Sequence, residues 1–202
     1  MEARVAKIIS VIFQPLLIPF YSLLLIFGLN NYISIIIPLA AKKMILALVF
    51  STTFLFPALF IFLLYKKGVI TSVQMRNRNE RIFPLIITSV FYFLSFHIIR
   101  KLHLPDVYLR LFFGSAVLVT VTLLVSLFWK ISAHMTGIGG MMGMLIGLSQ
   151  VIQNNLAGFV ILSALCCGLV GFARLKLMAH TQSQVYGGYF AGFIIMLVAI
   201  LM

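Results

Sequence analysis

Residues 108–129 read YLRLFFGSAVLVTVTLLVSLFW, with one charged side chain, Arg110, near the start. A helix crosses the hydrocarbon of a membrane in about 20 apolar residues, so this stretch is long enough to span it. Its apolar residues are continuous, whereas strands of a membrane β-barrel alternate apolar and polar residues. The stretch therefore predicts a transmembrane helix, and similar runs recur along the chain.

The composition extends this prediction to the whole chain of 202 residues, of which 63% are hydrophobic and 9% charged. Such a composition is typical of a polytopic membrane protein. We expect an all-α fold with one transmembrane domain over residues 1–202, a helical bundle of six to seven spans. The spans are expected near 8–29, 44–65, 83–100, 108–129, 135–151, 156–173 and 183–202. The number is six if the first segment, with Pro15 and Pro19, is bent or re-entrant.

The charge balance is strongly basic, with 15 Lys and Arg against three acids, Glu2, Glu80 and Asp106. In a soluble protein this balance would suggest nucleic acid. Here the cations lie at span ends, where they meet lipid head groups or anionic ligands, so we expect membrane lipids as partners and no nucleic acid. Three scattered acids cannot supply the several carboxylates of a Mg²⁺ site, and we expect no metal and no cofactor.

Three polar clusters occur at the ends of expected spans: residues 76–81 (RNRNER), residues 132–134 (SAH), and Arg174 with His180. Two spans separate each cluster from the next, so all three return to one face of the membrane. Ionisable groups held at span ends are candidates for function. His97 and His103 lie on the other face, and we expect structural roles for them.

Glycines indicate how two of these clusters meet. Gly139, Gly143 and Gly147 follow a four-residue spacing in the fifth span, and Gly188 and Gly192 do so in the last. Small residues at this spacing let helices approach closely in lipid. We therefore expect the helices that begin beside His134 and His180 to pack together.

Two imidazoles beside several guanidinium groups favour phosphoryl transfer without a metal. Arginine binds phosphate oxygens in bidentate fashion and can stabilise the charge of a transferring phosphoryl group. One histidine can attack phosphorus while the other protonates the departing oxygen. Backbone N–H groups near Ser132 and His134, where the fifth span begins, would add an anion site.

The clusters resemble the motifs of the type 2 phosphatidic acid phosphatase family of integral membrane lipid phosphatases. Its Pro-Ser-Gly-His motif appears here as Ile131-Ser132-Ala133-His134. Its Ser-Arg, five residues, His, three residues, Asp motif appears as Ala173-Arg174, five residues, His180, three residues, Gln184. Its Lys, six residues, Arg-Pro motif is matched loosely by Arg81 ahead of Pro84, with Arg76 or Arg78 in place of the lysine. The resemblance covers about residues 75–200.

This resemblance implies a membrane phosphatase that removes phosphate from a lipid phosphate or pyrophosphate through a phosphohistidine. It implies His180 as nucleophile, His134 as general acid, and Arg81, Ser132 and Arg174 as phosphate ligands. Gln184 stands where the family has an aspartate that orients the nucleophile. We expect its amide to accept a hydrogen bond from His180 across one helical turn, but to supply no charge, so that turnover is slow unless Glu80 assists.

Two other functions are open at this stage. A catalytically weak relative would bind lipid phosphate or transfer the group to another acceptor, and a small transporter would use the basic cluster as a vestibule. The membrane side is also open. Ten of the 15 cations fall on the face of the clusters, which favours the cytoplasm, but without Arg76, Arg78, Arg81 and Arg174 the balance is six to five. The resemblance favours a bacterial inner membrane with a periplasmic site.

Overall fold

The computed structural model describes residues 2–72, 75 and 77–202, and these form helices with no strand among them. The all-α prediction is confirmed. The elements are α1 (Glu2–Ile12), the 3-10 turn η1 (Pro15–Leu17), α2 (Ile18–Gly28), α3 (Tyr32–Ile35), α4 (Leu39–Phe50), the π-helical turn η2 (Ser51–Leu55), α5 (Phe56–Lys66), the 3-10 turn η3 (Asn79–Arg81), α6 (Ile82–Lys101), α7 (Asp106–Phe128), α8 (Ala133–Val151), α9 (Ala157–Lys176) and α10 (Gln182–Leu201).

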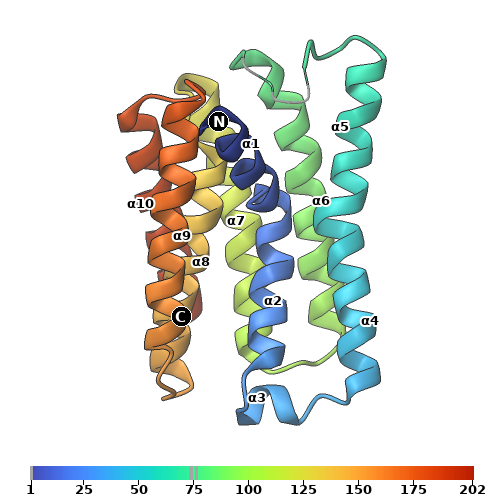
Figure 1. The fold of residues 1–202 in the computed structure, drawn as a ribbon. Coiled ribbons are helices and arrows are strands. Elements are labelled where there is room, and N and C mark those ends of the chain that lie inside the picture. Colours follow the sequence, from blue (N-terminus) through green and yellow to red (C-terminus); the bar gives the residue numbers. More distant parts are fainter. Residues whose placement is uncertain (1, 73–74, 76) are drawn as a thin grey trace.

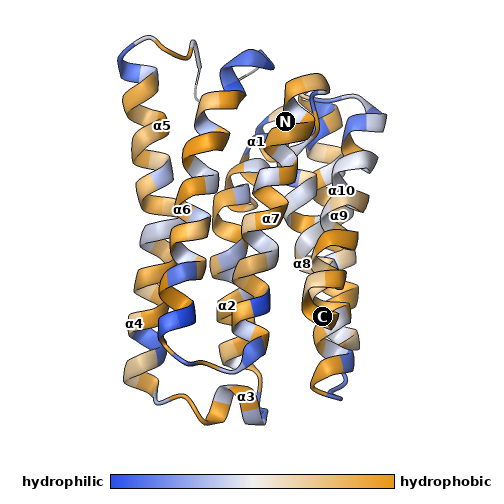
Figure 2. Ribbon diagram, turned by 180° about the vertical axis from the view of Figure 1, so that it is seen from behind, coloured by the Kyte–Doolittle hydropathy of each residue, from blue (hydrophilic) through white to orange (hydrophobic). Residues whose placement is uncertain are grey.

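The long helices run side by side between two ends of the bundle (Figure 1). One end, the basic end, carries α1, the described residues of the connection 67–78, and the connections 129–132 and 177–181. The opposite end carries α3 and the connections 102–105 and 152–156. Hydrophilic residues gather toward both ends, and apolar residues cover most of the length between them (Figure 2). This distribution is that of a bundle that spans a membrane.

Within the described residues, six segments are long and apolar enough to cross a membrane: Glu2–Gly28, Leu39–Lys66, Asn79–Lys101, Asp106–Phe128, Ala157–Lys176 and Gln182–Leu201. Helix α8, of 19 residues, lies between α7 and α9 in the sequence and runs from the basic end to the opposite end. It is less apolar because it carries five glycines and His134. The bundle therefore matches the expected six to seven spans. The stretch 32–40, too short to cross by itself, forms α3 and the start of α4.

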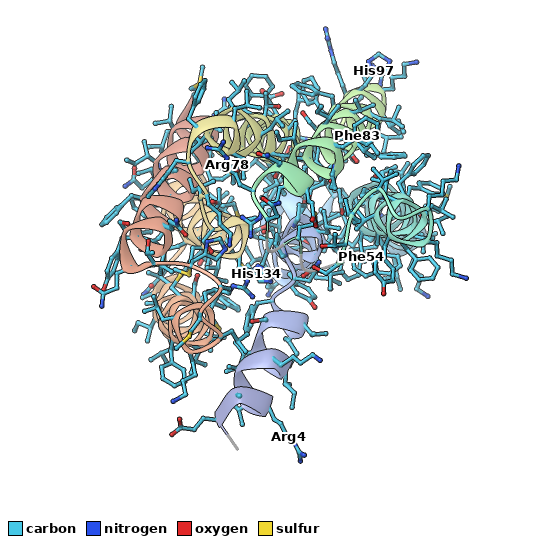
Figure 3. All side chains as sticks on the ribbon, turned by 90° about the horizontal axis from the view of Figure 1, so that it is seen from above. Arg4, Phe54, Arg78, Phe83, His97 and His134 are labelled. Carbon is cyan, nitrogen blue, oxygen red and sulfur yellow. The ribbon has the colours of Figure 1, made fainter. Side chains whose placement is uncertain are left out.

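The first segment is bent, as its prolines indicated. Helix α1 ends at Ile12, and Pro15 opens the turn η1 that leads into α2. Proline has no N–H to continue a helix, so the helical hydrogen bonds break here. Seen from above, α1 extends outward from the other helices and carries Arg4 at its tip (Figure 3). It packs against α9 at the basic end.

Helices α8 and α10 pack more closely than any other pair. A Cβ atom added at Gly143 would overlap the carbonyl oxygen of Phe193, and one added at Gly192 would overlap that of Thr136. The expected glycine-mediated contact between these helices is thus present, since only a hydrogen leaves room for the facing backbone. Because α8 and α10 pack this closely, His134 at the start of α8 lies near the loop before α10 that holds His180.

Candidate active site at the basic end

A cavity of about 940 Å³ opens at the basic end and extends into the bundle. Its polar part is lined by Lys7, Ser10, Gln14, Arg81, Lys130, His134, Arg174 and His180. Its deeper part is mostly apolar, with lining residues that include Leu85, Leu111, Leu118, Val119 and Met196. The hydroxyl groups of Thr88, Ser115 and Thr122, which also line it, donate to carbonyls of their own helices. None of the described lining residues is Asp or Glu. The cavity therefore joins a cationic head to an apolar interior.

The four central candidates come from four different parts of the chain. Arg81 lies just before α6, His134 in the first turn of α8, Arg174 in the last turn of α9, and His180 in the loop before α10. All four line the same cavity. The fold therefore brings these four residues, which represent all three polar clusters, to one end of the bundle.

His180 is held at both ring nitrogens. Its Nδ1 lies 3.1 Å from Oε1 of Gln184 and 3.3 Å from the carbonyl oxygen of Lys130. Both partners only accept, so Nδ1 carries the proton. Nε2 lies 3.3 Å from Nη2 of Arg81, which only donates, so Nε2 offers its lone pair. The ring is thus fixed in the tautomer that leaves Nε2 as the basic, nucleophilic nitrogen.

Gln184 meets His180 by a route different from the expected one. His180 lies before the helix, so the two residues do not share a helix face. Thr181 is instead the N-cap of α10, and Gln184 completes a capping box with it. Its Oε1 accepts the backbone N–H of Thr181 at 3.3 Å as well as Nδ1–H of His180. The cap therefore fixes which end of the amide faces the imidazole.

Burial of the ring, followed by the positive charge of Arg81, lowers the pKa of His180 from 6.5 to about 3. The side chain is 8% exposed. Transfer of a cation into such a site is unfavourable, and a neighbouring guanidinium makes it more so. His180 is therefore neutral at physiological pH, which is the state that a nucleophilic imidazole requires.

The two arginines differ in their free donors. Arg81 donates from Nε to the carbonyl of Met75 at 3.0 Å and from Nη1 to that of Ile131 at 3.0 Å, which leaves Nη2 directed at His180. Arg174 is 9% exposed and donates from Nη1 to Oγ of Ser10 at 3.2 Å, and its buried Nε has no partner in the part of the chain that the structure describes. Unpaired donors of a buried cation are unfavourable by themselves and suit an anion.

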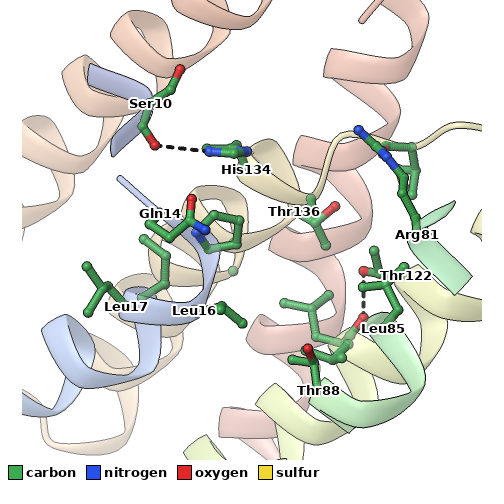
Figure 4. Close-up of a pocket in the computed structure, with 18 of the residues that line it drawn as sticks. Ser10, Gln14, Leu16, Leu17, Arg81, Leu85, Thr88, Thr122, His134 and Thr136 are labelled. Carbon is green, nitrogen blue, oxygen red and sulfur yellow. Dashed lines mark hydrogen bonds between the residues drawn. The ribbon is translucent and has the colours of Figure 1, made fainter. Parts of the chain in front are cut away.

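His134 completes the site from the side of α1. Its Nε2 lies 3.1 Å from the carbonyl oxygen of Ser10, which can only accept, so Nε2 carries a proton. In Figure 4, Ser10 and His134 face each other across this bond, and Arg81 reaches in from the opposite wall. Nδ1 of His134 is then the nitrogen that remains for proton exchange in the cavity.

The other candidates that the structure describes lie outside the cavity lining. Ser132 is fully buried and is the N-cap residue of α8, but its side chain makes no capping hydrogen bond, and its Oγ has no partner among the described residues. Arg78 donates to the carbonyl of Phe128 at 2.7 Å. Arg76 lies outside the described residues. Glu80, a possible helper of His180, instead accepts hydrogen bonds from Thr71 through both carboxylate oxygens. The phosphate-binding roles of Ser132, Arg78 and Arg76 stay predictions.

Sequence reasoning missed the contribution of the first span. Ser10 contacts both His134 and Arg174, and Lys7 and Gln14 line the cavity beside it. The one sequence signal here is Pro15, which predicts a bend in the span but not the edge of a site. A serine in an apolar helix carries no further mark, so its two contacts could not be foreseen.

In the part of the chain that the structure describes, no group of three or more His, Cys, Asp or Glu side chains could hold a metal ion. Among the described residues, the polar head of the cavity is built from guanidinium, ammonium, imidazole, carboxamide and hydroxyl groups. Comparisons with protein-family models, with curated proteins and with solved structures found no match to this chain.

Proposed function

We propose that this integral membrane protein is a phosphatase that removes phosphate from a membrane-embedded phosphate ester or pyrophosphate. The observation that carries the proposal is the setting of His180, whose Nδ1–H is bound on one side while Nε2 faces a guanidinium on the other. A buried imidazole needs neither a fixed tautomer nor an adjacent arginine for packing. Both features serve attack on a phosphoryl group.

The proposed reaction begins when phosphate oxygens take the donors of Arg174 and Nη2 of Arg81. The negative charge of the bound phosphate favours a second proton on His134, at Nδ1. Nε2 of His180 then attacks phosphorus, and the bond from phosphorus to the leaving oxygen breaks. That oxygen takes the Nδ1 proton of His134 and departs as an alcohol, or as a phosphate when a pyrophosphate is cleaved.

The second half of the reaction regenerates the protein. Nδ1 of His134, now without its proton, accepts one from a water molecule as the water oxygen attacks the phosphohistidine. The N–P bond breaks, its electron pair returns to Nε2 of His180, and inorganic phosphate leaves. The guanidinium groups of Arg81 and Arg174 stabilise the charge on the phosphoryl oxygens in both steps, the task that metal ions perform in other phosphoryl transferases.

The apolar part of the cavity supports a lipid substrate. On α7 the lining residues run from Ser126 near the basic end to Leu111. At 1.5 Å per residue these are about 22 Å apart along the helix, more than half of a hydrocarbon core of about 30 Å. A phosphate at the cationic head would therefore leave room for its hydrocarbon tail inside the bundle.

The test is release of inorganic phosphate by the purified protein from a panel of lipid phosphates and pyrophosphates in detergent with EDTA. We expect release from at least one member, undiminished by the chelator. Loss of turnover in EDTA with recovery in Mg²⁺ would contradict the proposed mechanism. Binding of a lipid phosphate without release from any member would favour a second candidate, a lipid-phosphate-binding relative, which the uncharged Gln184 behind His180 also suits.

A further inference from the structure

We propose that the break in the first span at Gln14 and Pro15 is part of the site, because it makes Ser10 a positioning residue for both His134 and Arg174. The inference rests on the proposed function for its catalytic meaning. Ser10 and Pro15 lie outside residues 75–200, the region that resembles the phosphatase motifs. Ser10 nevertheless contacts His134 on α8 and Arg174 on α9, two helices distant from it in sequence.

The break leaves the carbonyl of Ser10 available. In a continuous α-helix this oxygen would accept the N–H of Gln14, four residues on. Instead the N–H of Gln14 binds the carbonyl of Val11 at 3.3 Å, and Pro15 has no N–H to give. A carbonyl at the end of a helix needs another donor. Nε2–H of His134 supplies it at 3.1 Å.

This contact gives the two histidines opposite tautomers. The carbonyl of Ser10 requires the proton of His134 on Nε2 and leaves Nδ1 to exchange a proton. The carbonyl of Lys130 and the amide of Gln184 require the proton of His180 on Nδ1 and leave Nε2 to attack. The oxygen acceptors behind each ring thus determine that His180 acts as the nucleophile and His134 as the proton carrier.

The hydroxyl of Ser10 positions the arginine. Oγ donates its one hydrogen to the carbonyl of Ala6 at 2.9 Å, so toward Arg174 it can only accept. Nη1 of Arg174 donates to it at 3.2 Å. One corner of the guanidinium is thereby fixed, while Nε has no protein partner. Ser10 thus orients the arginine and leaves donors for phosphate oxygens.

The first arm of the test reads the tautomers by ¹⁵N NMR of histidine-labelled protein in detergent, with the His134 and His180 signals assigned from single substitutions. We expect His134 to be protonated at Nε2 and His180 at Nδ1, and we expect Pro15→Ala to abolish the Nε2 preference of His134 only. Pro38→Ala, at the opposite end, is the matched control. An Nδ1–H tautomer of His134 in the unaltered protein would overturn the inference whether or not phosphate is released.

The second arm uses kinetics. Ser10→Ala removes the acceptor of Arg174, and we expect KM to rise about fivefold with a smaller change in kcat, the size of one lost hydrogen bond. Ser10→Thr keeps a hydroxyl that can donate to Ala6 and accept from Arg174, and should restore KM. Pro15→Ala should instead lower kcat about tenfold, since proton transfer by His134 suffers. Unchanged kinetics in both Ser10→Ala and Pro15→Ala, with His180 still required for turnover, would overturn the inference and leave the phosphatase proposal standing.

Discussion

The two ends of the bundle carry similar residues in different settings. Each has two of the four histidines and several cations. At the opposite end, His97 and His103 are exposed, Arg110 donates to the carbonyl of Ile200 at 3.0 Å, and Lys42 binds Ser34 and the carbonyl of Phe27. At the basic end, His180 and Arg174 are buried and face one cavity. The difference indicates that convergence and burial, and not residue type, distinguish a candidate site from a basic rim.

The cavities at the two ends differ in the same way. The one at the opposite end, of about 500 Å³, is lined by Asp106 together with Arg110 and by no histidine. The larger cavity at the basic end has cations and both histidines without an acidic lining residue among those described. An anion would therefore be attracted to the cavity at the basic end, whose described lining holds cationic side chains and no Asp or Glu. Substitutions at the opposite end therefore serve as matched controls for substitutions at the basic end.

The largest expected effect comes from His180. His180→Ala should lower phosphate release by about 10³-fold or more, because the reaction loses its nucleophile. The matched change, His103→Asn, removes an exposed histidine at the opposite end, where φ is +50° and asparagine is tolerated. It should leave turnover unchanged. Initial rates on the best lipid of the panel measure both, and equal losses in the two variants would break the distinction between the ends.

Arg174→Ala should reduce kcat/KM by about 10²-fold, the usual cost of removing one donor to a developing oxyanion. Arg174→Lys should recover little, because an ammonium lacks the planar fork. Arg110→Ala is the control, since Arg110 binds a backbone carbonyl outside the site. The test is a comparison of steady-state kcat/KM for the three variants with that of the unaltered protein. If Arg174→Lys is fully active, the arginine acts only as a point charge.

A smaller effect, in the opposite direction, is expected at Gln184. Gln184→Glu keeps the capping box and places a carboxylate behind Nδ1 of His180, so turnover should rise by about tenfold. Glu80→Gln should change nothing, because Glu80 accepts from Thr71 and not from His180. Rates of the two variants, measured side by side, test this. No gain in Gln184→Glu would mean that charge behind the imidazole does not limit the rate.

The smallest effect concerns pH and stability. Burial lowers the pKa of His180 to about 3 in the folded protein, against 6.5 in the unfolded chain. The unfolded chain thus binds more protons between these values, so the contribution of His180 to stability is present above about pH 6.5 and is lost as pH falls toward 3. Thermal unfolding in detergent should show a steeper acid loss for the unaltered protein than for His180→Gln. His103→Asn, whose site is exposed, should keep the steep loss.

Much of the bundle could be predicted from sequence because lipid imposes strong rules. Apolar run length gave the spans, and the glycines at positions 139, 143, 188 and 192 indicated the contact of α8 with α10. The number of spans between the clusters predicted that Arg81, His134, Arg174 and His180 lie at one end. Residue spacing and the number of spans can both be counted in the sequence without knowledge of side-chain packing.

The rest of the site could not be foreseen because it depends on local breaks in helices. His180 was expected on the same helix face as Gln184, whereas α10 begins only at Gln182 and the contact runs through a helix cap. Ser10 acts through a carbonyl that the break before Pro15 leaves available. Ser132 matches a motif position, yet its hydroxyl is buried outside the cavity. Spacing along the chain does not report these backbone details.

The central claim is that His180 carries the phosphoryl group during turnover. The most direct measurement reacts the purified protein with its best lipid substrate, labelled with ³²P in the transferable phosphate, in EDTA, and looks for acid-labile, base-stable label on the protein. We predict that the unaltered protein, quenched during turnover, carries a phosphohistidine at His180, and that this label is absent from His180→Ala. Turnover by the unaltered protein without any labelled protein, or label that persists in His180→Ala, would contradict the account.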